Sequence, residues 1–170
     1  DYLVIGSHGE IKAKFREFLD KKSAEKLIGF FSLPHRDHNF IKEKSMAIIK
    51  SHEKAVEEKI VNDLLDNIGG KKWEAVAGTD SVLENLYLHN INMFIIGAHY
   101  KQPGFICGQC HYISIDSGTC PLCGGKISKA ADLADEIIEE ALKNKIKIKQ
   151  LFYSHKDFDR FGIGAFLKDY

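Results

Sequence analysis

The sequence predicts an α/β protein that carries a small cysteine-rich insertion. Apolar patterns of helical and strand period alternate along the chain, and all four cysteines fall in two C-x-x-C pairs. With 170 residues, 44% hydrophobic and 28% charged, the composition is that of a globular protein of one or two domains. The 24 basic and 24 acidic residues cancel, so any contact with nucleic acid must be local.

The start of the chain predicts two strands joined by a helix. Residues 2–6 form a short apolar run that ends at glycine, and residues 27–33 form a second apolar run. Between them, Ile11, Phe15 and Phe18 recur at helical spacing among charged residues. A strand, a crossover helix and another strand favour parallel pairing of the two strands.

A long helix is expected from about Phe40 to Asn67, and glycines 69 and 70 end it. Its expected inner side is lined by Ile48, Ile49, Val56, Ile60, Leu64 and Leu65. The pattern restarts after these glycines, which makes residues 69–78 the best boundary candidate. The chain is therefore expected to divide into residues 1–70 and 71–170.

The second part predicts helices and strands in alternation. The S-V-L-E run at residues 81–84 is a capping-box start for a helix, and residues 91–97 predict a buried strand. A helix is expected from about Lys129. In residues 146–153, apolar residues alternate with lysines, which is typical of a strand with one solvent-exposed face. A final apolar run starts at Ile163.

The strongest functional signal is the cysteine segment, residues 104–127. Its C-x-x-C pairs lie nine residues apart, the spacing of a zinc ribbon in which two knuckles direct four thiolates at one tetrahedral ion. The expected ligands are Cys107, Cys110, Cys120 and Cys123. Four sulfurs leave no open coordination position, so the zinc is expected to be structural. Two disulfides or free thiols are the alternatives, and His111 is either a replacement ligand or a bystander.

Other candidate sites carry weaker signals. His35, Asp37 and His38 lie between a strand end and a helix start, where active sites of parallel sheets often lie. Residues there also serve as turn and cap groups, and in that interpretation Asp37 or Asn39 caps the long helix. The Gly-Ser-His-Gly turn at residues 6–9 is either a phosphate cradle or a plain strand-to-helix turn. The residues alone predict no active site.

The sequence also predicts where in the cell the protein resides and whether this chain is complete. No apolar run is long enough to cross a membrane, and no signal peptide is visible. Reduced cysteines committed to a metal favour the cytoplasm. Because the chain starts at Asp1 with a strand-like run, we expect it to be a fragment of a longer protein. The sequence leaves the oligomeric state open.

Three patches, taken in order, carry a family resemblance. They are L-V-I-G-S-H-G-E-I-K at residues 3–12 with K-L-I-G at 26–29, E-N-L-Y-L to M-F-I-I-G at 84–97, and D-L-A-D-E at 132–136 with F-G-I-G-A-F-L at 161–167. They resemble the middle and third domains of the class I peptide chain release factors of archaea and eukaryotes. The likeness is greater to their bacterial release-factor-like relatives. A zinc ribbon after the first strand of the third domain also occurs in archaeal members.

The resemblance implies a fold. Residues 1–70 would be the C-terminal part of an RNase H-like middle domain. Residues 71–170 would be an α/β/α sandwich similar to kink-turn-binding proteins, with the ribbon at 104–127. The upstream strands of the middle domain would precede this chain, so its sheet is expected to have an unpaired edge.

The resemblance also implies a function. Such proteins act on peptidyl-tRNA at the ribosome, in translation termination or ribosome rescue, and the third domain contacts a translational GTPase or the ribosomal stalk. The family's catalytic Gly-Gly-Gln is absent, because the Gly-Gly pairs at 69–70 and 124–125 are each followed by lysine. The chain is therefore expected to be a docking and scaffold part, while an upstream Gly-Gly-Gln would let the longer protein promote hydrolysis. The turn at 6–9 differs from the family's G-G-P-G-P-T-K, which favours a release-factor-like paralogue.

Two other functions compete with this interpretation. A non-catalytic RNA- or ribosome-binding module would need a basic surface, for which the candidates are Lys126, Lys129, Lys143, Lys145, Lys147 and Lys149. The ordinary alternative is that these lysines are simply solvated. A zinc-stabilised enzyme would instead use the loop at residues 35–38.

Overall fold

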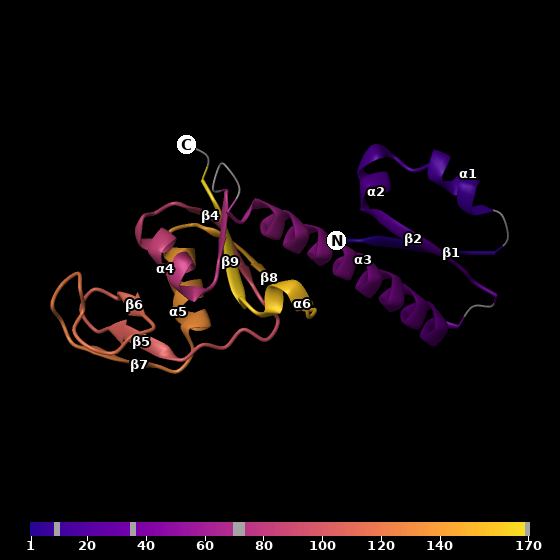
Figure 1. Cartoon of the computed structure of the whole chain (residues 1–170). Helices are drawn as coiled ribbons and strands as arrows, with labels where there is room; N and C mark the ends of the chain where they lie inside the picture. Colours follow the sequence, from indigo (N-terminus) through magenta and orange to yellow (C-terminus); the bar gives the residue numbers. More distant parts are fainter. Residues whose placement is uncertain (9–10, 35–36, 70–73, 169–170) are drawn as a thin grey trace. The chain divides into compact units, whose positions relative to one another are not determined.

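The computed structural model describes residues 1–8, 11–34, 37–69 and 74–168, which form two compact units, Asp1–Val56 and Glu57–Tyr170. The long helix α3 (His38–Asn67) contributes its first half to one unit and its second half to the other (Figure 1). The division into residues 1–70 and 71–170 stays a prediction. In packing terms, residues 57–67 belong with the second unit.

The first unit contains a two-stranded parallel sheet, as the sequence predicted. Its elements before α3 are β1 (Leu3–Ser7), α1 (Ile11–Glu17), α2 (Lys21–Lys26) and β2 (Leu27–Ser32). The connection is two short helices because Asp20 caps the second one, accepting a hydrogen bond from Ser23 N at 3.0 Å. Among the described residues, β1 and β2 pair only with each other, so the expected unpaired edge is present.

The start of α3 confirms the capping interpretation of Asp37. Its Oδ1 accepts a hydrogen bond from Asn39 N at 2.8 Å, which satisfies a main-chain donor of the first turn. His38 is exposed at the first position of the helix, and His35 lies outside the described residues. Gly9 of the candidate phosphate turn lies outside them as well. The described part of these two loops therefore brings no metal or acid–base cluster together.

The second unit is built on a four-stranded mixed sheet of order β3-β9-β4-β8. Its elements outside the ribbon are β3 (Ala75–Ala77), α4 (Thr79–Tyr87), β4 (Ile91–Ile96), α5 (Leu133–Lys143), β8 (Lys147–Gln150), α6 (Lys156–Asp159) and β9 (Ile163–Leu167). Strand β9 runs antiparallel to β3 and β4, whereas β4 and β8 are parallel. The three longer strands confirm the sequence predictions, whereas β3 and α6 had no clear signal.

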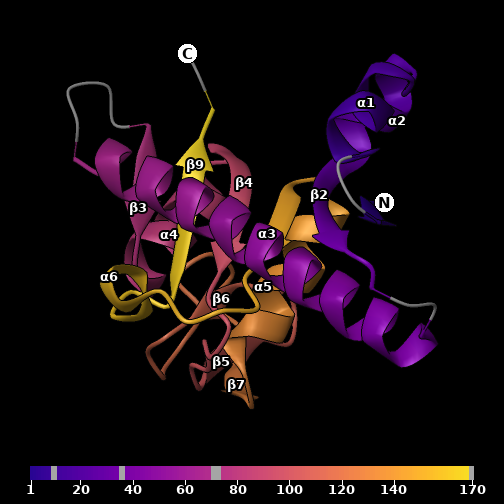
Figure 2. The same ribbon diagram turned by 90° about the vertical axis from the view of Figure 1, so that its right-hand side faces the viewer.

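Helices cover both faces of this sheet, which makes a three-layer sandwich (Figures 1 and 2). In β4, Phe94 and Ile96 pack in the cluster that includes α4 and α5. Ile95 packs in the other cluster, with Leu64 from the second half of α3 and Phe158 from α6. The alternation follows because successive strand residues point to opposite faces. The mixed α/β architecture that the sequence predicted is therefore present.

Two helix starts differ from the sequence predictions. Helix α4 begins at Thr79 without a side-chain cap, because Gly78 takes the N-cap position with φ of 90°, which glycine tolerates. Helix α5 begins at Leu133 and not near residue 129. The preceding residues pair in β7 (Ile127–Ala130), and Asp132 then caps the helix by accepting a hydrogen bond from Ala134 N at 3.0 Å.

Gly164 of β9 lies where a side chain would collide with the core. A Cβ there would lie 2.7 Å from Leu64 Cδ2 and 3.1 Å from Val76 O. We expect Gly164→Ala to lower the free energy of unfolding by about 1–3 kcal/mol, because overpacking forces the core to shift. Urea denaturation followed by circular dichroism measures the change. Gly108→Ala is the control, since no atom lies within 4 Å of its Cβ position. Equal losses in both variants would contradict the packing argument.

Candidate metal centre

The cysteine segment forms a small antiparallel sheet of order β6-β5-β7 that is anchored to the sandwich. Strand β5 (Gly104–Cys107) pairs with β6 (Ile113–Ser114) and with β7. The side chains of Ile113 and Ala130 are buried in the same apolar cluster as α4 and α5. The Tyr87 hydroxyl of α4 donates a hydrogen bond to Ile113 O at 2.8 Å. These contacts place the ribbon against the α4 side of the sandwich.

All four cysteines come together, as the spacing predicted. Their sulfurs lie within 4.8 Å of one another. The Sγ–Sγ distances are 3.5 Å between Cys107 and Cys123 and 3.4 Å between Cys110 and Cys120. A disulfide needs about 2.05 Å, so the thiols are free and the disulfide alternative fails. Tetrahedral bonds of about 2.3 Å would space the sulfurs by about 3.8 Å, close to this arrangement. The group is therefore compatible with a zinc site.

The two knuckles share one main-chain design. His111 N donates to Cys107 O at 3.0 Å, and Gly124 N donates to Cys120 O at 2.9 Å. The residue that closes each turn is left-handed, with φ of 57° at His111 and 70° at Gly124. Glycine suits this conformation, whereas histidine adopts it against its preference. His111 closes this turn and is not among the four residues whose sulfurs cluster.

Main-chain N–H groups stabilise the thiolate form of Cys107. The N–H groups of Cys110 and Gln109 point at its sulfur and lower the pKa of the Cys107 thiol to about 6. The Gln109 N to Cys107 Sγ distance is 3.5 Å. In the second knuckle, Gly125 N lies 3.4 Å from Cys123 Sγ. Metal ligands must be deprotonated, and the lowered pKa of Cys107 favours this for one of the four thiols. Desolvation and the neighbouring sulfurs raise the pKa of the Cys110 thiol, so a metal would have to displace its proton.

Metal affinity should therefore fall as the pH drops, and more steeply below about 6, where Cys107 binds a proton as well as the other three thiols. The lowered pKa keeps Cys107 as a thiolate above that value, and below it protons compete with the metal for the sulfur. Competition with a chromogenic chelator, from about pH 8 down to about pH 5, measures the change. The α-helical circular dichroism of the same samples serves as the control for global unfolding. An affinity that is constant across this range would contradict thiolate ligation.

A second polar cluster, which the sequence analysis did not identify, surrounds Glu57 of α3. The side chain is fully buried. Its carboxylate accepts hydrogen bonds from Phe152 N at 3.0 Å and from Tyr153 N at 3.1 Å. His155 Nε2 lies 3.3 Å from Oε2, and Lys149 Nζ lies 3.8 Å from Oε1. These contacts hold the segment after β8 against α3. A glutamate in a highly charged helix gives no local signal that it will be buried.

The expected basic surface is partly neutralised by carboxylates. Lys143 Nζ lies 2.9 Å from Glu139 Oε1, and Lys149 pairs with the buried Glu57. Two of the six lysines proposed for RNA contact are thus engaged within the chain.

Among the described residues, no helix is both long enough and apolar enough to cross a membrane.

The fold of the chain is similar to the folds of archaeal and eukaryotic release-factor-like proteins. No protein-family model matches the chain, and no curated protein matches it in sequence. The sequence-based resemblance is therefore confirmed at the level of fold.

Three solved structures illustrate the likeness. The C-terminal domain of a peptide chain release factor from Methanosarcina mazei has a TM-score of 0.51 at 19% identity, over 79% of this chain and 96% of that one. Pelota from Archaeoglobus fulgidus has a TM-score of 0.51 at 16% identity, over 98% of this chain and 48% of that one. Dom34 from S. cerevisiae has a TM-score of 0.56 at 12% identity, over 98% of this chain and 46% of that one. The chain thus spans about half the length of Pelota and Dom34.

Proposed function

We propose that this chain is the C-terminal docking part of a release-factor-like protein that acts in translation termination or in the rescue of stalled ribosomes. The observation that carries the proposal is the fold, which matches Pelota and Dom34 over 98% of the chain. Dom34 is described as a translation termination-like factor that is involved in RNA quality control pathways and interacts with Hbs1. By analogy, the partners proposed here are the ribosome, peptidyl-tRNA and a translational GTPase, in the cytoplasm.

A structural zinc would hold the ribbon in this proposal. Cys107, Cys110, Cys120 and Cys123 supply four sulfurs within 4.8 Å of one another, which suits a closed tetrahedral site. A closed site keeps no position for water, so the metal would shape the ribbon and would not generate a hydroxide. With no Gly-Gly-Gln in the chain, its own contribution is placement and not hydrolysis.

The test uses ribosomes stalled on an mRNA that lacks a stop codon. We expect the metal-loaded chain to sediment with these complexes and to release no peptide, whereas a longer protein with an upstream Gly-Gly-Gln should release it. Variants His35→Ala and His38→Ala of the chain serve as controls for the loop at residues 35–38. The absence of ribosome binding would contradict the docking role. Peptide release that either histidine change abolishes would make that loop an active site.

A further inference from the structure

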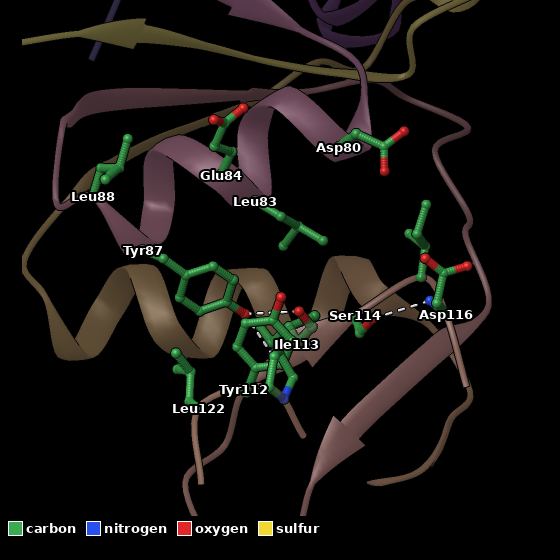
Figure 3. Close-up of a pocket in the computed structure, with 12 residues that line it drawn as sticks. Asp80, Leu83, Glu84, Tyr87, Leu88, Tyr112, Ile113, Ser114, Asp116 and Leu122 are labelled. Carbon is green, nitrogen blue, oxygen red and sulfur yellow. Dashed lines mark hydrogen bonds between the residues drawn. The ribbon is translucent and has the colours of Figure 1, made fainter. Parts of the chain in front are cut away.

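The proposed function does not use a groove that runs between α4 and the ribbon. The groove has a volume of about 480 Å³. Its apolar lining includes Leu83, Tyr87 and Leu88 on one side and Tyr112, Ile115 and Leu122 on the other. Figure 3 shows Leu83 and Tyr87 projecting from α4 toward the ribbon residues (Figure 3). Both walls belong to the second unit.

The shape of the groove suits a peptide segment better than a compact metabolite. Residues 80, 83, 84, 87 and 88 line it, which are successive positions on one face of α4 and its C-cap. At 1.5 Å per residue this face is about 12 Å long. A furrow of that length accommodates about two turns of a helix, whose apolar side chains recur at the same spacing.

Contacts within the chain hold the floor of the groove in place without a ligand. Tyr87 stacks on Tyr112 with ring centroids 4.5 Å apart, and its hydroxyl bonds the main chain of Ile113. Burial raises the pKa of Tyr87, so the phenol stays a neutral donor. A preformed floor lowers the entropy lost on binding.

Apolar and acidic groups together define the chemistry of a partner. Leu88 and Leu122 are 64% and 66% exposed, which is unfavourable for leucines that gather at one groove. Asp80, Glu84 and Asp116 add three carboxylates to the lining, and no lysine, arginine or histidine lines the groove in the described part of the chain. The lining of the groove therefore combines apolar side chains with negative charge.

We propose that this groove docks a basic amphipathic helix of a partner protein. Two or three apolar side chains of that helix, spaced three or four residues apart, would cover Leu83, Leu88 and Leu122. Lysine or arginine side chains beside them would face the carboxylates, which steers association and sets specificity. The inference rests on the groove's own lining and holds whether or not the chain acts at the ribosome.

A peptide-display selection tests this proposal. Random 16-residue peptides are selected on the metal-loaded chain and counter-selected on the Leu88→Asp, Leu122→Asp double variant. We expect the enriched peptides to combine spaced apolar residues with lysine or arginine. In fluorescence anisotropy, the Asp80→Lys, Glu84→Lys, Asp116→Lys variant should bind them at least about tenfold more weakly, and added salt should weaken binding to the natural chain.

Matched controls keep the result interpretable. Phe152→Asp changes another exposed apolar residue, 73% accessible and outside the groove, and should leave binding unchanged. Metal content and circular dichroism must agree among all variants. Enrichment of acidic peptides, no enrichment over the double variant, or equal binding to the charge-reversed variant would each overturn the proposal. So would a dimer in sedimentation that Leu122→Asp dissociates, because a second copy would then be the occupant.

Discussion

Cys107→Ser should abolish stoichiometric metal binding and unfold the ribbon. The Cys107 side chain is buried, and its sulfur lies 3.5 Å from Cys123 Sγ. A serine hydroxyl at that place is a poor zinc ligand compared with a thiolate. We expect the metal content to fall from about one zinc per chain to below about 0.1, measured by inductively coupled plasma mass spectrometry.

The sandwich should remain folded in this variant. The sheet pairs β4 with β8 and β9 without any ribbon residue, and the cluster around Leu64 and Phe158 does not touch the ribbon strands. Hydrogen exchange should therefore rise in residues 104–130 and stay low in β4 and β9. Because Ile113 and Ala130 pack beside α4 and α5, those helices should gain some exchange.

His111→Gly is the matched control for the cysteine change. It removes the neighbouring candidate ligand and supplies the residue that a φ of 57° favours. Metal content should stay at about one per chain, with equal or higher stability. Loss of the metal in His111→Gly, or its retention in Cys107→Ser, would show that the ligand set is wrong.

Glu57→Ala should be among the most destabilising substitutions on α3. The change removes the acceptor of the Phe152 and Tyr153 N–H groups and the carboxylate beside His155. Deleting one partner of a buried polar network leaves the others without compensation for their desolvation. We expect the free energy of unfolding to fall by about 3–5 kcal/mol in urea denaturation of the metal-loaded protein.

Two companion variants separate the network from the lost side-chain volume. Glu57→Gln keeps one oxygen acceptor and should lose less than Glu57→Ala. Asp66→Ala changes an exposed acidic residue on the same helix and should stay within about 0.5 kcal/mol of the natural chain. A cost for Glu57→Ala no larger than that of Asp66→Ala would mean that the carboxylate does not hold the segment after β8.

The burial of Glu57 in the second unit also bears on where a shorter version of the protein should begin. Residues 57–67 supply this carboxylate together with Val61 and Leu64, all buried in the second unit. A protein that begins at residue 71 would lack the α3 residues that cover one face of the sheet together with α6. The expected division at residue 70 describes where two domain families meet in the resemblance. The second compact unit, in contrast, includes residues 57–67 of α3.

The sequence by itself determined the features that depend on neighbouring residues. Local sequence patterns placed α3 and strands β1, β2, β4, β8 and β9, because helix and strand repeats appear within a few residues of chain. The expected inner side of α3 was only partly right, since Leu64 is buried whereas Val56 is exposed. The two C-x-x-C pairs predicted the sulfur cluster, since each knuckle is a local turn. Asp37 and Asn39 were the two candidate caps for the same reason, and the structure shows that Asp37 is the cap.

Only the tertiary structure decided the features that join distant segments. The burial of Glu57 depends on main-chain donors 95 and 96 residues later in the chain. Helix α5 starts later than the sequence predicted because residues 127–130 pair with β5. The groove exists because α4 and the ribbon contact each other at Tyr87 and Ile113. A local pattern shows which face of an element is apolar. It does not show which other face will cover it, because that depends on the free energy of the whole packed arrangement.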